Sequence, residues 1–159
     1  MKAKDIMTAS PCTCSPNDSV QDVARTMRDH DCGAVPITDK GRLVGIITDR
    51  DLTIRALAGG LDPASRVADV ITREPSSCSS DADLTEIERV MSDQQVRRVP
   101  IVDADKRVVG IVSQADLARA LVDGRNISEH EVALVMERVS MPRHRPFDHG
   151  VNTNLEQPL

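Results

Sequence analysis

Aromatic residues are almost absent from this sequence, which has one Phe and neither Trp nor Tyr in 159 residues. Proteins that bind single-stranded nucleic acid usually stack the bases on aromatic side chains, and a net charge of -5 disfavours a phosphate backbone as the main partner. We therefore predict that nucleic acid is not a partner, although the basic run Arg143, His144 and Arg145 leaves a weaker anion-binding alternative open. A flat ring bound here would have to lie between aliphatic side chains and backbone groups.

Long hydrophobic runs and an arrangement typical of catalysis are also missing. The longest apolar run, around residues 43–47, is far shorter than the roughly 20 apolar residues of a membrane-spanning helix, and the first residues lead into no apolar signal region. We predict a cytoplasmic protein without a membrane partner.

No Ser or Cys stands in a nucleophile context with a base, and the four His residues are scattered. We therefore predict that the chain is not an enzyme and has no catalytic residues.

An internal duplication is the main positive feature of the sequence. The run Gly-Ile-Ile-Thr-Asp-Arg-Asp-Leu at 45–52 returns as Gly-Ile-Val-Ser-Gln-Ala-Asp-Leu at 110–117, and the preceding residues match at an offset one residue shorter. The matched pairs include Thr8 with Thr72, Pro11 with Pro75, and Met27 with Met91. A repeat of this length predicts that one structural unit is used twice.

Each repeat has the hydrophobic periodicity of strand, helix, strand, strand and helix. In the first repeat we expect a short strand at 13–14, a helix from Val20 capped by Ser19 with Asp22, strands at 34–38 and 43–48, and a helix from Asp49 to about Gly59. In the second, Asp83 and Glu86 should cap a helix, and strands at 99–102 and 108–112 should precede a helix at 115–122.

These elements predict an α+β (mixed α/β) fold. It consists of two β-α-β-β-α units related by a pseudo-twofold axis, each too small to be stable alone and therefore sharing a core. We place the units at 1–62 and 63–124, an extra helix at 125–141 and a polar tail at 142–159. The extra helix has an apolar stripe of Val132, Val135, Met136 and Val139, which we expect to need a partner surface and which favours a homodimer.

The strand-to-helix junctions carry a hydroxyl residue followed three positions later by an aspartate, as Thr48 with Asp51 and Ser113 with Asp116. Such a pair is a capping box, in which the side chains satisfy backbone N–H groups of the first helical turn. The same geometry would let the carboxylate accept hydrogen bonds from a ribose diol beside a phosphate at the helix start. The spacing alone leaves both interpretations open.

The four cysteines, Cys12, Cys14, Cys32 and Cys78, match neither a disulfide framework nor a zinc-binding spacing. Cys14 and Cys78 occupy equivalent places in the two repeats. We predict buried, inert thiols, with a metal site or a redox pair among Cys12, Cys14 and Cys32 as the alternative.

The duplicated segments 5–8, 35–37 and 45–51 resemble a tandem pair of cystathionine-β-synthase-type (CBS) domains, also called a Bateman module, over residues 5 to about 122. The chain is also similar to small bacterial proteins that consist of such a pair alone. The resemblance implies two clefts that bind an adenosyl ligand, with AMP as the first candidate and ATP, ADP, NAD or S-adenosylmethionine as alternatives. No metal is expected.

The resemblance also implies which residues form the clefts. Asp51 and Asp116 would hold the ribose hydroxyls, with Thr48 and Ser113 beside the ribose or phosphate. The remaining implied residues would line the adenine pockets: Thr8, Ala34, Val35, Pro36, Thr72, Arg98, Val99 and Pro100. The second copy has Ala115 in the place of Arg50, so we expect its cleft to lack a cation unless Arg97 or Arg98 supplies one.

Two functions follow from these observations. The first is a non-catalytic regulatory module that binds an adenosyl ligand and reports its occupancy to an unknown protein effector. The alternative is a structural or redox-responsive, stress-linked dimerisation protein with empty clefts.

Overall fold

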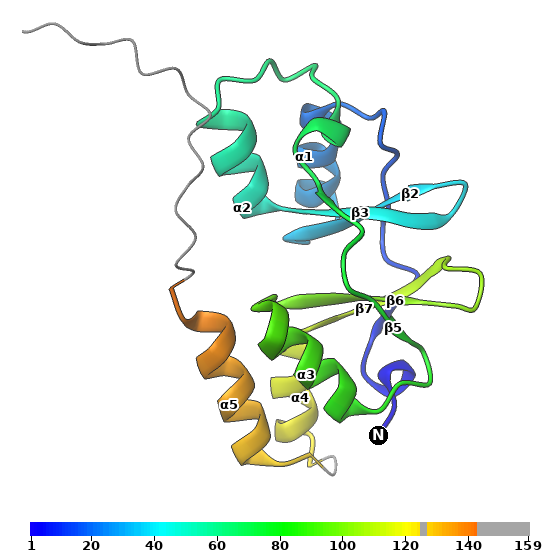
Figure 1. Ribbon diagram of the computed structural model, residues 1–159, viewed down its shortest axis with the longest axis vertical. Coiled ribbons are helices and arrows are strands. Elements are labelled where there is room, and N and C mark those ends of the chain that lie inside the picture. The colour runs from blue at the N-terminus through cyan, green and yellow to red at the C-terminus, as the bar shows by residue number, and fades with distance from the viewer. Residues whose placement is uncertain (125–126, 143–159) are drawn as a thin grey trace, which may run out of the picture.

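The computed structural model describes residues 1–124 and 127–142. Figure 1 shows two sheets stacked face to face between two outer layers of helices. The three-stranded sheet has the order β2-β3-β4 and the four-stranded sheet the order β1-β7-β6-β5. This arrangement confirms the predicted α+β fold, with one sheet and its helices for each repeat. The predicted tail at 142–159 lies almost wholly outside the described residues.

The first repeat follows the predicted order with two differences. Helix α1 (Val20–Asp29) is capped by Ser19, which accepts a hydrogen bond from the N–H of Asp22, and it leads into β2 (Ala34–Asp39) and β3 (Arg42–Thr48). The helix predicted after β3 is α2 (Asp49–Asp51) continued by the π-helical segment η2 (Leu52–Leu57). The strand predicted at 13–14 is wrong, because Cys14 forms only a single parallel bridge with Ile37.

The second repeat contains β5 (Cys78–Ser79), α3 (Leu84–Gln94), β6 (Arg98–Val102), β7 (Val108–Ser113) and α4 (Gln114–Val122). Strand β5 runs parallel to β6, as the strand-helix-strand step predicts. Asp83 is the N-cap residue of α3, but its side chain makes no capping hydrogen bond. The predicted cap pair of Asp83 and Glu86 is therefore wrong. The Asp83 carboxylate pairs instead with Lys2 Nζ at 2.9 Å, near the short helix η1 (Ala3–Asp5).

Two short strands that the sequence pattern did not predict link the repeats. Strand β1 (Thr8–Ala9) precedes the first repeat's α1 but pairs with β7 of the second repeat. Strand β4 (Thr72–Arg73), which follows the short helix η3 (Val67–Asp69), pairs with β3 of the first repeat. Each sheet is therefore completed by the segment that leads into the other repeat.

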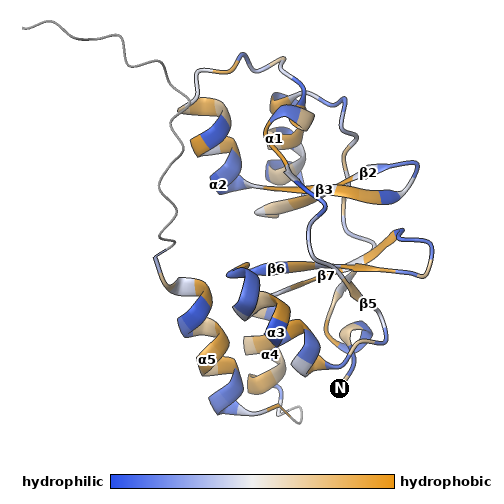
Figure 2. Cartoon of the chain, in the orientation of Figure 1, coloured by the Kyte–Doolittle hydropathy of each residue, from blue (hydrophilic) through white to orange (hydrophobic). Residues whose placement is uncertain are grey.

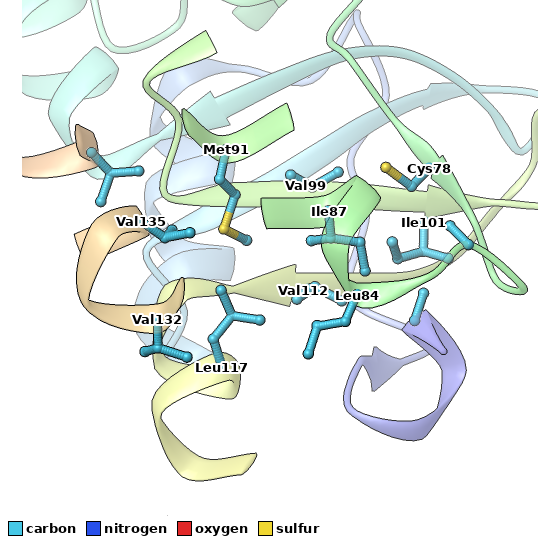
Figure 3. Close-up of a cluster of buried hydrophobic side chains, with 13 residues drawn as sticks. Cys78, Leu84, Ile87, Met91, Val99, Ile101, Val112, Leu117, Val132 and Val135 are labelled. Atoms are coloured by element: carbon cyan, nitrogen blue, oxygen red, sulfur yellow. The ribbon is translucent and has the colours of Figure 1, made fainter. Parts of the chain in front are cut away.

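Each repeat has its own hydrophobic core between its sheet and its helices, so the expectation that the two units share one core is wrong. The first core includes Val23, Val35, Ile37 and Ile47. The second is larger and is drawn in Figure 3 around Ile87, Met91, Val99, Ile101, Val112 and Leu117. In Figure 2 the outer helices carry both hydrophilic and hydrophobic residues, as expected for helices that cover a core on one side.

The extra helix α5 (Glu129–Ser140) belongs to the second core. It packs against α3 and α4, and its stripe residues Val132, Val135 and Val139 are all buried there, with Met136 packed against them. The expectation that this stripe needs a partner surface is therefore wrong, because α3 and α4 of the same chain cover it. Among the described residues, none of the helices is both long and apolar enough to cross a membrane.

Candidate functional site

The exchanged strands bring the two predicted threonines to the opposite repeats. Thr8 lies across from Ile111 in β7, and Thr72 lies across from Ile46 in β3. Two glycines make these close pairings possible. A Cβ on Gly110 would lie 2.9 Å from Met7 Cγ, and a Cβ on Gly45 would lie 3.2 Å from the backbone oxygen of Thr72. Each repeated motif therefore begins with glycine because the crossing segment leaves no room for a Cβ at that position.

Both predicted hydroxyl–aspartate pairs form complete capping boxes. At the start of α4, the backbone N–H and the hydroxyl of Ser113 each donate to Asp116 Oδ2 at 2.6 Å, and the Asp116 N–H donates to Ser113 Oγ at 3.3 Å. The corresponding distances for Thr48 and Asp51 are 2.9, 2.8 and 3.2 Å. The capping interpretation is therefore confirmed at both junctions, and it uses only one oxygen of each carboxylate.

The second carboxylate oxygen faces an arginine. Asp116 Oδ1 forms an ion pair with Arg119, and Asp51 Oδ1 lies 3.5 Å from Arg55 Nε. Asp116 is only 7% exposed, whereas the Arg119 side chain is 67% exposed. A buried carboxylate needs a compensating charge or hydrogen bonds, so Arg119 neutralises Asp116 and can leave it only if another donor takes its place.

Asp116 lies in a cleft of about 390 Å³, a volume within the range of small-molecule sites. Five of the predicted site residues line this cleft: Thr8, Ala34, Arg98, Ser113 and Asp116. They come from β1, β2, β6, β7 and α4, so both repeats contribute to one cavity. Its other lining residues are Ser10, Pro11, Cys12, His30, Asp31, Cys32, Gly33, Ile111 and Arg119.

Two arginines line the cleft, so the expected loss of a cation at Ala115 does not leave it without positive charge. The Arg98 side chain reaches from the second repeat to the turn of the first. A Cβ placed on Gly33 would lie 2.8 Å from Arg98 Nη2. Arg119 is the other cation, three residues after Asp116. Arg50, the residue expected to supply the cation in the first repeat, is exposed.

The other predicted pair forms a second, related cluster. Arg55 approaches Asp51 and also donates hydrogen bonds to the backbone oxygen of Val70 at 2.9 Å and to Thr72 Oγ1 at 3.4 Å. Arg55 thus links the Thr48–Asp51 pair to Thr72. In the other cluster, the Ser113–Asp116 pair and Thr8 line the same cleft. The hydroxyl–aspartate pairs follow the pseudo-twofold relation, whereas the arginines occupy different positions, four residues after Asp51 and three residues after Asp116.

The remaining predicted residues have a different environment. Val35 and Val99 are fully buried and belong to the two hydrophobic cores, and Pro36 is also fully buried. Pro100 is buried in β6. Their side chains therefore serve packing, and any ligand contact at these four residues would have to use their backbone groups. That contact stays a prediction.

Sequence reasoning missed Arg119 and the turn residues 30–33. A signal for Arg119 was present, because position i+3 from Asp116 lies on the same face of the helix. Asp31 has a φ of 48°, and the equivalent Gln95 has a φ of 50°, so the turn is a shared feature of both repeats. No periodicity of the sequence predicts which cleft such a turn lines.

Comparison with known proteins gives one family. The family model described as "CBS domain" matches residues 3–57 and again residues 67–123. The chain is 37% identical to hypoxic response protein 1 of Mycobacterium tuberculosis over 142 residues, which cover 88% of this chain and 94% of that protein. A crystal structure of the hypoxic response protein with two coordinated zinc ions superposes with a TM-score of 0.69 and 40% identity over 75% of this chain and 98% of that one.

Two further solved structures contain ligands. The CBS domain pair of protein MJ0100, in complex with 5′-methylthioadenosine and S-adenosyl-L-methionine, has a TM-score of 0.71 at 32% identity, over 79% of this chain and 98% of that one. CBSX2 in complex with AMP has a TM-score of 0.66 at 25% identity, over 77% and 96%. The prediction that no metal is required is not confirmed, since one similar structure holds zinc. In the described residues here, no group of three or more His, Cys, Asp or Glu side chains is arranged to hold a metal ion.

Proposed function

The chain belongs to the CBS-domain family as a tandem pair, and on this premise we propose that it is a non-catalytic regulatory protein that binds an adenosyl ligand in the cleft beside Asp116. The observation that carries the proposal is the combination, in one cavity, of a buried carboxylate with two arginines. AMP is our first candidate, with ADP, ATP, NAD and S-adenosylmethionine as alternatives. Related CBS pairs are named as complexes with AMP and with S-adenosylmethionine, which supports this ligand class.

The ribose would be recognised by Asp116. Its Oδ2 is used by the cap, whereas Oδ1 pairs with the exposed Arg119, and both residues line the cleft. A ribose diol that donates to Oδ1 would replace the arginine as the hydrogen-bond donor. The freed guanidinium of Arg119 could then bind a phosphate of the same ligand, so that no buried charge is left uncompensated.

The base would be held without aromatic stacking. Ile111, Pro11 and Ala34 line the cleft and offer aliphatic surfaces for the two faces of a purine. The edge of the base would be recognised by backbone groups, as the resemblance implies for the strands around residues 34–36 and 98–100. This mode favours adenine over guanine only through hydrogen-bond pattern, so guanosine analogues are the appropriate negative controls.

Isothermal titration calorimetry with AMP, S-adenosylmethionine and GMP tests the proposal. We expect an adenosyl compound to bind and GMP to bind more weakly. Asp116→Asn should weaken binding about tenfold or more, because hydrogen bonds to a charged group contribute roughly 1.5–3 kcal/mol. Asp51→Asn is the matched control for the second cluster. If no adenine compound binds at millimolar concentration, or if Asp116→Asn binds as tightly as the parent chain, the proposed site is wrong.

A homodimer in the cytoplasm is part of the proposal, with the output partner unidentified. The α5 stripe is covered within the chain and gives the dimer no support, but Leu57 (77% exposed) and Leu61 are exposed apolar residues of the first repeat that a second copy could cover. The alternative of a dimerisation protein with empty clefts predicts the same dimer without nucleotide binding. Sedimentation velocity over a range of concentrations tests the dimer that both functions share, and the calorimetric titration with AMP separates the two functions.

A further inference from the structure

We infer that Cys12 and Cys32 form a reversible disulfide site in the wall of the Asp116 cleft. Their sulfur atoms lie 3.5 Å apart, although the residues are separated by 20 positions in the sequence. A disulfide needs a sulfur–sulfur distance of about 2.05 Å. The two sulfurs therefore have to approach by only about 1.5 Å, a shift within the reach of side-chain rotation and a small backbone adjustment.

The pair is specific to one of the two repeats. The positions equivalent to Cys12 and Cys32 in the second repeat are Ser76 and Val96, whereas Cys14 is matched by Cys78. The CBS scaffold thus folds with Ser and Val at these two places and does not need a thiol there. Cys14 and Cys78 are buried core residues, while Cys12 and Cys32 are both partly exposed and line the cleft.

The surroundings of Cys12 keep it protonated in the reduced protein. Burial, and then the hydrogen bond with Cys32, raise the pKa of the Cys12 thiol to about 11. At neutral pH a thiol of this kind reacts slowly with oxidants. The dithiol form should therefore persist until a disulfide of low molecular weight, such as oxidised glutathione, is present in excess, and oxidation should become faster as the pH rises.

The reaction is a thiol–disulfide exchange in two steps. The thiolate of one cysteine attacks a sulfur of oxidised glutathione, forms a mixed disulfide and displaces one glutathione thiolate. The second cysteine, 3.5 Å away, then attacks the protein sulfur of that mixed disulfide and displaces the second glutathione. The protein dithiol loses two electrons, oxidised glutathione gains them, and the two protons end on the two glutathione thiols released.

Disulfide formation is linked to the ligand cleft by position. Cys12 lies three residues after β1 and Cys32 two residues before β2, and residues of both strands line the cleft. A ligand in the cleft would cover both thiols and slow their reaction, which is a consequence that rests on the proposed function. The exchange reaction itself does not depend on any ligand.

The test is equilibration of the full chain with reduced and oxidised glutathione, followed by acid quenching, alkylation and mass spectrometry. We expect two of the four thiols to escape alkylation, no glutathione adduct, and one crosslinked peptide that joins Cys12 to Cys32. The double variant Cys12→Ser with Cys32→Val copies the second repeat and should fold without forming the crosslink. Cys78→Ser should keep it, and Cys12→Ser alone should accumulate glutathione on Cys32.

Four results of the oxidation experiment would overturn the inference. These are a crosslink between Cys14 and Cys32, a crosslink between two chains, a stable mixed disulfide in the parent chain, and no oxidation even in oxidised glutathione alone. Binding of one zinc ion per chain that protects both thiols and is lost in Cys12→Ser would also overturn it, by making the pair metal ligands.

A second arm adds AMP at about 100 times its dissociation constant, so that roughly one molecule in 100 has an empty cleft. Oxidation should then slow at least tenfold in the parent chain and less in Asp116→Asn. If the crosslink forms but AMP does not bind, the disulfide site stands and the proposed function fails. If AMP binds and no crosslink forms, the proposed function stands and the disulfide site fails.

Discussion

Met7 packs against Gly110 so closely that a Cβ on Gly110 would lie 2.9 Å from Met7 Cγ and 3.2 Å from Met7 Cβ. Met7 precedes β1, and Gly110 lies in β7, where it pairs with Ala9. The contact therefore fixes the amino-terminal segment of the chain onto the sheet of the second repeat, and it positions Thr8 in the wall of the cleft.

Gly110→Ala should destabilise the protein by about 1–3 kcal/mol, since the added methyl group meets the first atoms of the Met7 side chain, which cannot rotate away. Gly33→Ala is the control, because the atoms its Cβ would approach are the ends of the flexible Arg98 and Asp49 side chains. Urea unfolding of both variants measures the difference. Equal midpoints for Gly110→Ala and the parent chain would contradict the packing argument.

Thr48→Ala should lower the free energy of unfolding by about 1 kcal/mol, because it removes the hydroxyl that caps the helix start. Thr53→Ala is a matched control in the following helical turn. The Thr53 hydroxyl donates only to the backbone oxygen of Asp49, and alanine has the higher helix propensity. Thermal unfolding should show a loss for Thr48→Ala and little change for Thr53→Ala; a reversed order would contradict the capping assignment.

Glu88 should make stability depend on pH. It is only 6% exposed in α3, its Oε1 has no hydrogen-bond partner among the described residues, and burial followed by repulsion from Glu131 raises its pKa. The folded protein therefore holds this proton more tightly than the unfolded chain. Glu88 costs stability above its folded-state pKa, and this cost disappears as the pH falls to the unfolded value near 4.5.

Glu88→Gln should accordingly stabilise the protein at pH 7 by about 1 kcal/mol and remove this contribution to the pH dependence. Glu86→Gln, on the exposed side of the same helix, should instead cost a few tenths of a kcal/mol by weakening the charge at the helix start. Denaturant midpoints measured at a series of pH values report both effects. A loss of stability in Glu88→Gln at neutral pH would mean that the carboxylate has a stabilising partner.

Val135→Ala should destabilise the second repeat by about 2 kcal/mol, because Val135 is buried between α5 and the rest of the core. Leu134→Ala removes more apolar surface from a neighbouring but exposed position and should change stability by less than about 0.5 kcal/mol. Chemical unfolding of the two variants decides whether α5 is part of the fold. If both variants unfold like the parent chain, α5 does not contribute to the core.

The parts of this protein that depend on local periodicity and on repetition could be predicted from the amino-acid sequence. The hydroxyl–aspartate pairs cap their helices as their spacing requires, because a capping box involves only residues three positions apart. The strands around Val35 and Val99, and the helix face of Ile87 and Met91, follow from the period of their apolar residues. The duplication then indicated the family without any knowledge of the fold.

Which segments contact one another could not be predicted from the sequence and follows from the three-dimensional fold. Strands β1 and β4 are two residues long, too short for a periodic signal, and each pairs with the sheet of the other repeat. That exchange places Thr8 beside the cleft of Asp116. The fold also brings Cys12 to Cys32 and gives Arg98 and Arg119 a common cavity. The α5 stripe was visible in the sequence, but its partner was not, because an apolar face specifies that it will be buried and leaves open against what.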